Sequence, residues 1–117
     1  MRIWDIPVEC LCRNHLLAEH RELHAIWNTV VESKSGYSKH PETQRWSGRL
    51  RALWKRHEEQ VAEMSKRGYA HRSPLDVKDI PRRHRGGRQT VLLITRNQQL
   101  RVLKAKGCAC RTEGKLR

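Results

Sequence analysis

The densest run of charged residues in the sequence is basic, with Arg82, Arg83, His84 and Arg85 in succession. Residues 66–117 carry 15 lysines and arginines against 3 acidic residues, whereas residues 1–65 carry 10 against 9. Cationic side chains in such numbers suit contacts to backbone phosphates, which are independent of base sequence and weaken as salt rises. The charge pattern therefore predicts a polyanionic partner such as DNA, although a solvated basic loop would contain the same residues.

The four cysteines form two Cys-x-Cys pairs, Cys10/Cys12 and Cys108/Cys110, one near each end of the chain. Four thiolates would satisfy a zinc ion, but zinc-binding cysteines are usually separated by two to four residues. The N-terminus does not have the pattern of a secretory signal, and no apolar run approaches the roughly 18 residues that span a membrane. We therefore expect an intracellular protein with reduced, free thiols and no bound metal.

Three polar residues near the N-terminus, His15, Glu19 and Glu22, recur at intervals of four and three. In a helix this spacing places them on one side, with Arg21 next to them. Such a side can be a solvated face stabilised by pairs at (i, i+3) and (i, i+4). It can also present a carboxylate for chemistry, and the spacing alone leaves both interpretations open.

The spacing of apolar residues predicts three helical segments that would position these side chains, at residues 14–32, 42–67 and 90–106. Asn14 and Thr90 are the expected N-caps, and Gly68 is expected to end the second segment. The third segment begins with a β-branched run that could also form a strand, and we favour a helix.

The intervening residues 70–89 contain several prolines and glycines and are expected to be irregular. Trp46 and Trp54 lie at helical spacing and are expected in the core. Leu, Ile, Val and Phe number 24 of 117 residues, which suits one core. The prediction is an all-α, compact single domain of about three main helices over residues 1–117, with 107–117 as a flexible tail.

Several blocks of the sequence, in the same order, resemble the phage endonuclease V family of pyrimidine dimer DNA glycosylases with an associated abasic-site lyase activity. The similarity is loose after residue 86. The blocks that carry it are Met1-Arg2-Ile3, His15-Leu16-Leu17-Ala18-Glu19-His20-Arg21-Glu22-Leu23, Leu50-Arg51-Ala52-Leu53, Lys66-Arg67-Gly68-Tyr69, Asp79-Ile80-Pro81 and Arg85-Gly86.

The resemblance implies a compact all-α fold whose N-terminus lies beside the first helix. It also implies a DNA repair enzyme that needs no cofactor and acts, as a monomer, on double-stranded DNA containing pyrimidine dimers or abasic sites. Its place would be the cytoplasm, at the nucleoid, or a host cell if a virus encodes it.

In the family, the α-amine of the N-terminal residue attacks C1′ of the damaged nucleotide, and the resulting imine permits β-elimination of the strand. Met1 matches the position of that residue, where the family has a threonine. Arg2 is too large for removal of the initiator methionine, so we expect Met1 to be retained. Glu22 matches the essential glutamate, which would stabilise positive charge on the sugar and move protons.

The resemblance also implies DNA contacts for Arg2, His15 and Arg21. Ala25 replaces a family arginine, a loss for which other residues could substitute. The candidate substitutes are Lys39, His40 and Arg45, and the expected contacts to the phosphate backbone come from Arg82, Arg83 and Arg85.

The family's aromatic C-terminal tail is not found in residues 107–117, which leaves the preferred lesion open. Tyr37, in the predicted loop of residues 33–43, is a candidate for stacking on a base. Two alternatives remain: a glycosylase and lyase for another base lesion, and a non-catalytic basic DNA-binding protein.

Overall fold

The computed structural model describes residues 2–32, 39–71 and 73–111, and this part of the chain is helical, without β-strands. The all-α prediction is confirmed. Short 3-10 turns occur at Val8–Cys10, Val77–Asp79 and Arg82–His84. The four α-helices are α1 (Arg13–Val31), α2 (Pro41–Trp46), α3 (Leu50–Lys66) and α4 (Arg96–Ala105).

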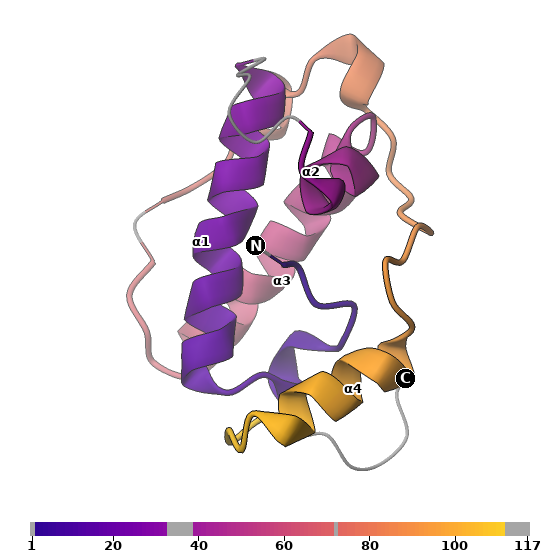
Figure 1. Cartoon of the computed structure of the whole chain (residues 1–117). Coiled ribbons are helices and arrows are strands. Elements are labelled where there is room, and N and C mark those ends of the chain that lie inside the picture. The colour runs from indigo at the N-terminus through magenta and orange to yellow at the C-terminus, as the bar shows by residue number, and fades with distance from the viewer. Residues whose placement is uncertain (1, 33–38, 72, 112–117) are drawn as a thin grey trace.

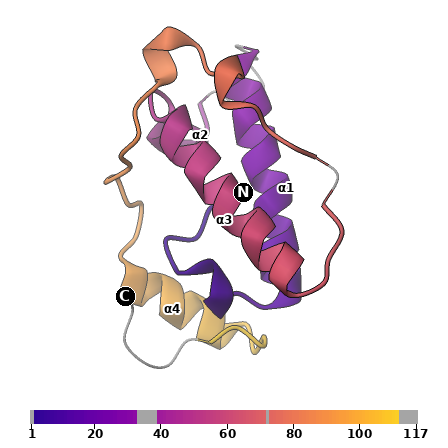
Figure 2. The same cartoon turned by 180° about the vertical axis from the view of Figure 1, so that it is seen from behind.

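Helices α1 and α3 pack against each other, and the N-terminal segment runs beside α1 (Figures 1 and 2). Leu16, Leu23 and Trp27 face the core as their spacing predicted. Helix α1 begins at Arg13 with Cys12 as its N-cap and no capping side-chain bond, so the expectation of Asn14 as the cap is wrong. The N-terminus beside the first helix agrees with the resemblance.

The predicted helix over 42–67 is two helices, because a turn at residues 47–49 separates α2 from α3. Gly48 has a φ of 80°, a left-handed conformation that a glycine adopts without a steric penalty. His40 caps α2, with Pro41 in its first turn. Gly68, with a φ of 82°, follows α3 as expected.

Helix α4 is shorter than the predicted segment, because it is capped at Thr95 rather than Thr90. Thr95 and Gln98 form a capping box, in which each side chain bonds the other residue's backbone amide. Residues 90–94 precede the helix without regular structure.

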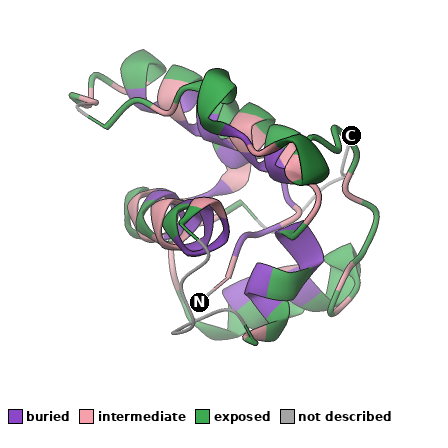
Figure 3. Cartoon of the chain, turned by 90° about the horizontal axis from the view of Figure 1, so that it is seen from above, coloured by how far each residue is buried: buried purple, intermediate pink, exposed green. Residues whose placement is uncertain are grey.

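Two clusters of buried apolar side chains make up the core, and their buried residues face inward from the helices (Figure 3). The larger cluster joins α1, α2 and α3 with Ile3 and Ile80. The second joins residues 4–11 to α1, α3 and α4.

The chain after α4 packs against this second cluster, and Arg111 donates its backbone N–H to the carbonyl of Cys10 over 2.7 Å. Residues 107–111, which were predicted to belong to a flexible tail, thus make backbone and side-chain contacts in the structure. Residues 112–117 lie outside the described residues. Among the helices described, none has the length and apolar character of a membrane span.

Candidate functional site

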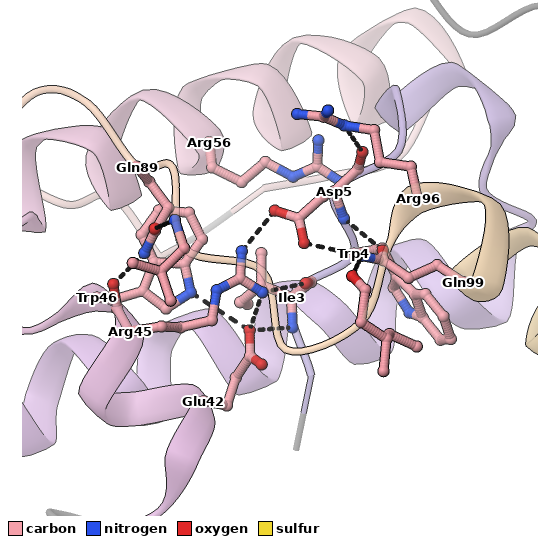
Figure 4. Close-up of polar contacts among 12 residues, drawn as sticks. Ile3, Trp4, Asp5, Glu42, Arg45, Trp46, Arg56, Gln89, Arg96 and Gln99 are labelled. Carbon is pink, nitrogen blue, oxygen red and sulfur yellow. Dashed lines mark hydrogen bonds and ion pairs between the residues drawn. The ribbon is translucent and has the colours of Figure 1, made fainter.

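Three successive backbone amides of the N-terminal segment, residues 2–5, are held by side-chain oxygens from three different helices. Figure 4 shows two of these contacts, those of Ile3 with Glu42 and of Asp5 with Gln99. The N–H of Ile3 donates to Glu42 Oε1 on α2 over 3.0 Å. Trp4 donates to Glu19 Oε1 on α1 over 2.7 Å, and Asp5 donates to Gln99 Oε1 on α4 over 2.8 Å. A buried extended segment with no neighbouring strand needs such acceptors, so this cage sets the register of the N-terminus.

Two of the acceptors belong to buried ion pairs. Arg45 donates to Glu42 Oε1 over 2.9 Å and also bonds the carboxylate of Asp5 (Figure 4). Burial raises the pKa of Glu42, and the charge of Arg45 opposes that rise. Because Arg45 is only 4% exposed, it is not presented to a DNA phosphate as the sequence suggested.

Glu19 is the centre of the second ion pair. Arg56 on α3 donates from Nε and Nη2 to its two oxygens, each over 3.0 Å, and the side-chain amide of Gln60 donates to it as well. Burial by itself would lower the pKa of Arg56, but the charge and hydrogen bonds of Glu19, together with the charges of Glu59 and Asp5, outweigh it and the pKa is raised.

The spacing of polar residues left open whether Glu19 lies on a solvated face, and the structure excludes that interpretation because the residue is 1% exposed. A signal was available: Glu19 lies three residues after Leu16 and four before Leu23, both core positions, so it shares their side of the helix.

Glu22 lies on the flank of α1, half-buried, and its carboxylate has no hydrogen-bond or ion-pair partner within residues 2–32, 39–71 and 73–111. Leu23 and Ile26 belong to the same core cluster as Ile3, so the N-terminal segment packs against the part of α1 that carries Glu22. Arg21 is exposed beside it. Met1, the expected nucleophile, lies outside the described residues.

Four histidines gather on the other side of α1. Their ligand atoms lie within 4.8 Å of one another, and the set comprises His20, His24, His57 and His71. His20 also contacts Gln60 over 2.9 Å, which connects the histidines to Glu19. Burial, reinforced by the neighbouring His20, lowers the pKa of His24 to about 4.

Positions two apart on a helix point to nearly opposite sides, so His20 and His24 face away from Glu22. The sequence analysis did not single out this group. The spacing of His20 and His24 by four was visible, but their partners on α3 and at residue 71 come from distant positions.

Three cysteines and His15 form another group whose ligand atoms lie within 4.8 Å of one another. His15 Nδ1 is 3.1 Å from Cys12 Sγ and 3.4 Å from Cys110 Sγ, and Cys108 is the remaining member. Burial raises the pKa of Cys110 to about 12. Burial would also raise the pKa of Cys12, but hydrogen bonds with His15 and Cys110, together with the charge of His15, outweigh it and lower the value to about 7.

The basic segment, residues 82–88, is almost entirely exposed, including Arg82, Arg83 and Arg85. Backbone contacts attach it to the turn before α3 and to the first turn of that helix. Gly86 N donates to Gly48 O over 2.9 Å, and Ala52 N donates to Gly86 O over 3.1 Å.

Two further candidate DNA contacts, Lys39 and His40, lie at the start of α2, where His40 is the N-cap. Lys39 is exposed, whereas the Nδ1 of His40 accepts the backbone N–H of Glu42 over 3.1 Å. Arg2 lies over the ring of Trp4, with 4.9 Å from its Cζ to the ring centroid. Tyr37 lies outside the described residues.

Comparison with protein families gives one decisive result: residues 1–77 match the model of the pyrimidine dimer DNA glycosylases. The chain belongs to this family. No curated protein and no solved structure matches it. The family acts in DNA repair, and its substrate is DNA.

The match to the glycosylase family covers Glu19, Glu22 and Glu42 but ends before the basic segment and α4. Two of the three acceptors that hold the N-terminal segment thus lie in the matched region, whereas Gln99 lies beyond it. In this glycosylase the positively charged half is therefore largely outside the matched region.

Proposed function

We propose that this chain is a bifunctional pyrimidine dimer DNA glycosylase and abasic-site lyase that uses the Met1 α-amine as nucleophile and Glu22 as its acid–base group. The amine attacks C1′ of the damaged nucleotide while the glycosidic bond breaks, and the base departs with the bonding electrons and takes up a proton. Loss of an amine proton and ring opening of the sugar give the imine. Removal of a C2′ proton then expels the 3′ phosphate.

The observation that carries this proposal is the cage around residues 3–5. A nucleophile at the chain end is useful only if its position is fixed, because reacting groups tolerate displacements of about an ångström or less. Three consecutive backbone amides donate hydrogen bonds to Glu42, Glu19 and Gln99, which leaves no freedom to slide the segment by one residue.

The protonation state of the nucleophile is also suitable. An α-amino group titrates near pH 7.7–8.0, so a useful fraction is neutral at physiological pH without assistance from a buried partner. Glu22 is half-buried and its carboxylate makes no ion pair with the described residues, so it is available to exchange protons.

Binding to the duplex is assigned to exposed cations. Arg21 and Lys39 are exposed in the N-terminal half of the chain, and Arg82, Arg83 and Arg85 are exposed in the basic segment. Their contacts would be to phosphates and would carry affinity rather than lesion recognition. Recognition of damage would follow from the ease with which damaged DNA unstacks and bends.

Borohydride trapping on duplexes containing a pyrimidine dimer or an abasic site tests the chemistry. We expect a reduced protein–DNA adduct that maps to residue 1 by peptide mass. An adduct on a lysine such as Lys39 contradicts the Met1 assignment, and binding without any adduct or cleavage supports the non-catalytic alternative.

A single residue added before Met1 provides the matched variant. It moves the amine by roughly 3.5 Å, so cleavage and trapping should collapse while DNA binding persists. The control carries the same residue at the C-terminus and should cleave normally. A panel of other base lesions, run with the unmodified protein, separates a pyrimidine dimer enzyme from a glycosylase for another lesion.

A further inference from the structure

The group of three cysteines and His15 brings together residues from the two ends of the described chain. Cys12 is the N-cap of α1, and His15 lies in the first turn of that helix. Cys108 and Cys110 follow α4, where Gly107 turns the chain with a φ of 64°. Cys108 and Cys110 pack against the second core cluster, but neither that packing nor the DNA chemistry proposed above requires three thiols and an imidazole to converge.

The separations bracket those in a tetrahedral metal site, so small side-chain movements would complete one. Zinc lies about 2.3 Å from thiolate sulfur and about 2.0 Å from imidazole nitrogen, which places its ligand atoms roughly 3.5–3.8 Å apart. His15 Nδ1 lies 3.1 Å from Cys12 Sγ and 3.4 Å from Cys110 Sγ. All four ligand atoms, that of Cys108 included, fall within 4.8 Å of one another.

We infer that Cys12, His15, Cys108 and Cys110 form a structural Cys₃His zinc site. Three soft thiolates and one imidazole in a compact tetrahedral set are the ligands of structural zinc, and they leave no open position for catalysis. Binding of the ion displaces one proton from each of the three thiols.

The surroundings supply the contacts that orient metal ligands. The backbone N–H of Cys12 donates to Cys110 Sγ over 3.0 Å, a bond that persists and strengthens when the sulfur is a thiolate. The ring of Trp4 meets the ring of His15 edge to face, with 5.8 Å between centroids, and fixes the imidazole plane. Coordination through Nδ1 leaves Nε2 of His15 available for the DNA contact that the family resemblance implies.

The site would connect the C-terminal helix to the start of the fold. Helix α4 provides Gln99 and Arg96, which bond the backbone N–H and carbonyl of Asp5 over 2.8 and 3.0 Å. A zinc ion at the end of α4 therefore fixes a helix that itself holds the N-terminal segment. The inference does not depend on the proposed reaction, because metal content and stability can be measured without DNA.

The first test is metal analysis of untagged protein purified from zinc-replete cells without chelator. We expect about one zinc ion per chain, and the cobalt-substituted protein should show intense thiolate-to-cobalt charge-transfer absorption. This spectrum is measured on the unsubstituted chain, so it remains informative if cysteine variants fail to fold. Protein without zinc, or cobalt protein without thiolate bands, overturns the inference.

Variants assign the ligands. Cys110→Ser and Cys12→Ser should each weaken zinc affinity by at least tenfold, whereas Cys10→Ser, which alters the cysteine outside the group, should retain the metal. Zinc that survives Cys110→Ser but is lost in His57→Gln would lie at the histidine group and would overturn the assignment. A disulfide between two of the three thiols in protein kept under reducing conditions would also overturn it.

Discussion

The N-terminal segment (residues 2–5) and the basic segment (residues 82–88) both lie outside the α-helices, but the fold holds them in different ways. Each backbone amide of residues 3–5 donates a hydrogen bond to a buried side chain, and two of those side chains are ion-paired. The basic segment is attached chiefly through backbone contacts at Gly86 and presents its arginines to solvent. The N-terminal segment is therefore held in a fixed position, whereas the basic segment presents positive charge at the surface.

Glu19→Ala should have the largest effect on the contacts that hold the N-terminal segment. The substitution leaves Arg56 buried without its partner and removes the acceptor for Trp4 N–H. Loss of one member of a buried ion pair typically destabilises a fold by about 3–5 kcal/mol. Urea denaturation measures the free energy of unfolding.

The control is Glu59→Ala, at an exposed position of α3, which should change stability by less than about 0.5 kcal/mol. If Glu19→Ala proves too unstable to purify, Glu19→Gln preserves an acceptor for Trp4 and should fold with a smaller loss. Equal stability of the Glu19→Ala and Glu59→Ala variants would contradict the role of Glu19.

Glu22→Gln tests the chemistry beside the same segment without disturbing its anchors. The amide retains the shape of the side chain but cannot exchange the proton, so turnover on dimer-containing DNA should fall by about 10²-fold or more. DNA affinity and thermal stability should be unchanged. Turnover within threefold of the unsubstituted protein would assign Glu22 to a solvated helix face.

Gly86→Ala tests how the basic segment is attached. A Cβ at this position would lie 2.5 Å from the carbonyl oxygen of Gly48, so the two backbones must separate. Crowding of this kind costs about 1–3 kcal/mol of folding free energy. Gly87→Ala is the matched control, because its Cβ would meet only flexible side chains, Lys55 Nζ at 3.5 Å and Arg51 Cδ at 3.9 Å.

Removal of charge from the basic segment should leave stability intact and change DNA binding instead. Combined replacement of Arg82, Arg83 and Arg85 by glutamine should make the plot of log affinity against log salt less steep by about 3. Intact and damaged duplexes should be affected alike. The control replaces a second exposed triplet, Arg101, Lys104 and Lys106, and should change the slope less. Equal changes would mean that net charge, and not this surface, determines binding.

The helices were predictable from the sequence where local periodicity decided them. Leu16, Leu23 and Trp27 specify α1, and Gly68 marks the end of α3. The break between α2 and α3 was missed because apolar spacing continues across Gly48, whose left-handed conformation stops the helix.

The site was less predictable, because its contacts join distant positions. Glu42 reaches Ile3 across 39 residues, and Cys110 reaches His15 across 95. From the sequence alone, a charged residue such as Arg45 is expected at the surface, because its buried partners cannot be identified without the structure. The position of Glu22 near the N-terminal segment came from resemblance, not from any pattern that the residues alone provide.

Acid should lower the stability of the network that holds the N-terminal segment, because that network is connected to the histidine group. His24 faces His20, His57 and His71, and burial lowers its pKa to about 4, below the value near 6.5 of the unfolded chain. Between these values the unfolded chain binds more protons, so stability is fully present above about pH 6.5 and declines as the pH falls toward 4.

Because His24 is only partly buried, we expect its share of this loss to be about 1 kcal/mol. Thermal melts of chelator-treated protein from pH 7 to pH 4 measure it, and His24→Gln should flatten the profile.

His84 also has a lowered pKa, from burial and from Arg83, and its Nδ1 accepts the Gly48 N–H at the base of the basic segment. His84→Gln therefore measures how much stability the basic segment loses at low pH. His24→Gln measures the same loss for the network that holds the N-terminal segment. A pH profile that neither substitution alters would place the acid sensitivity outside both regions.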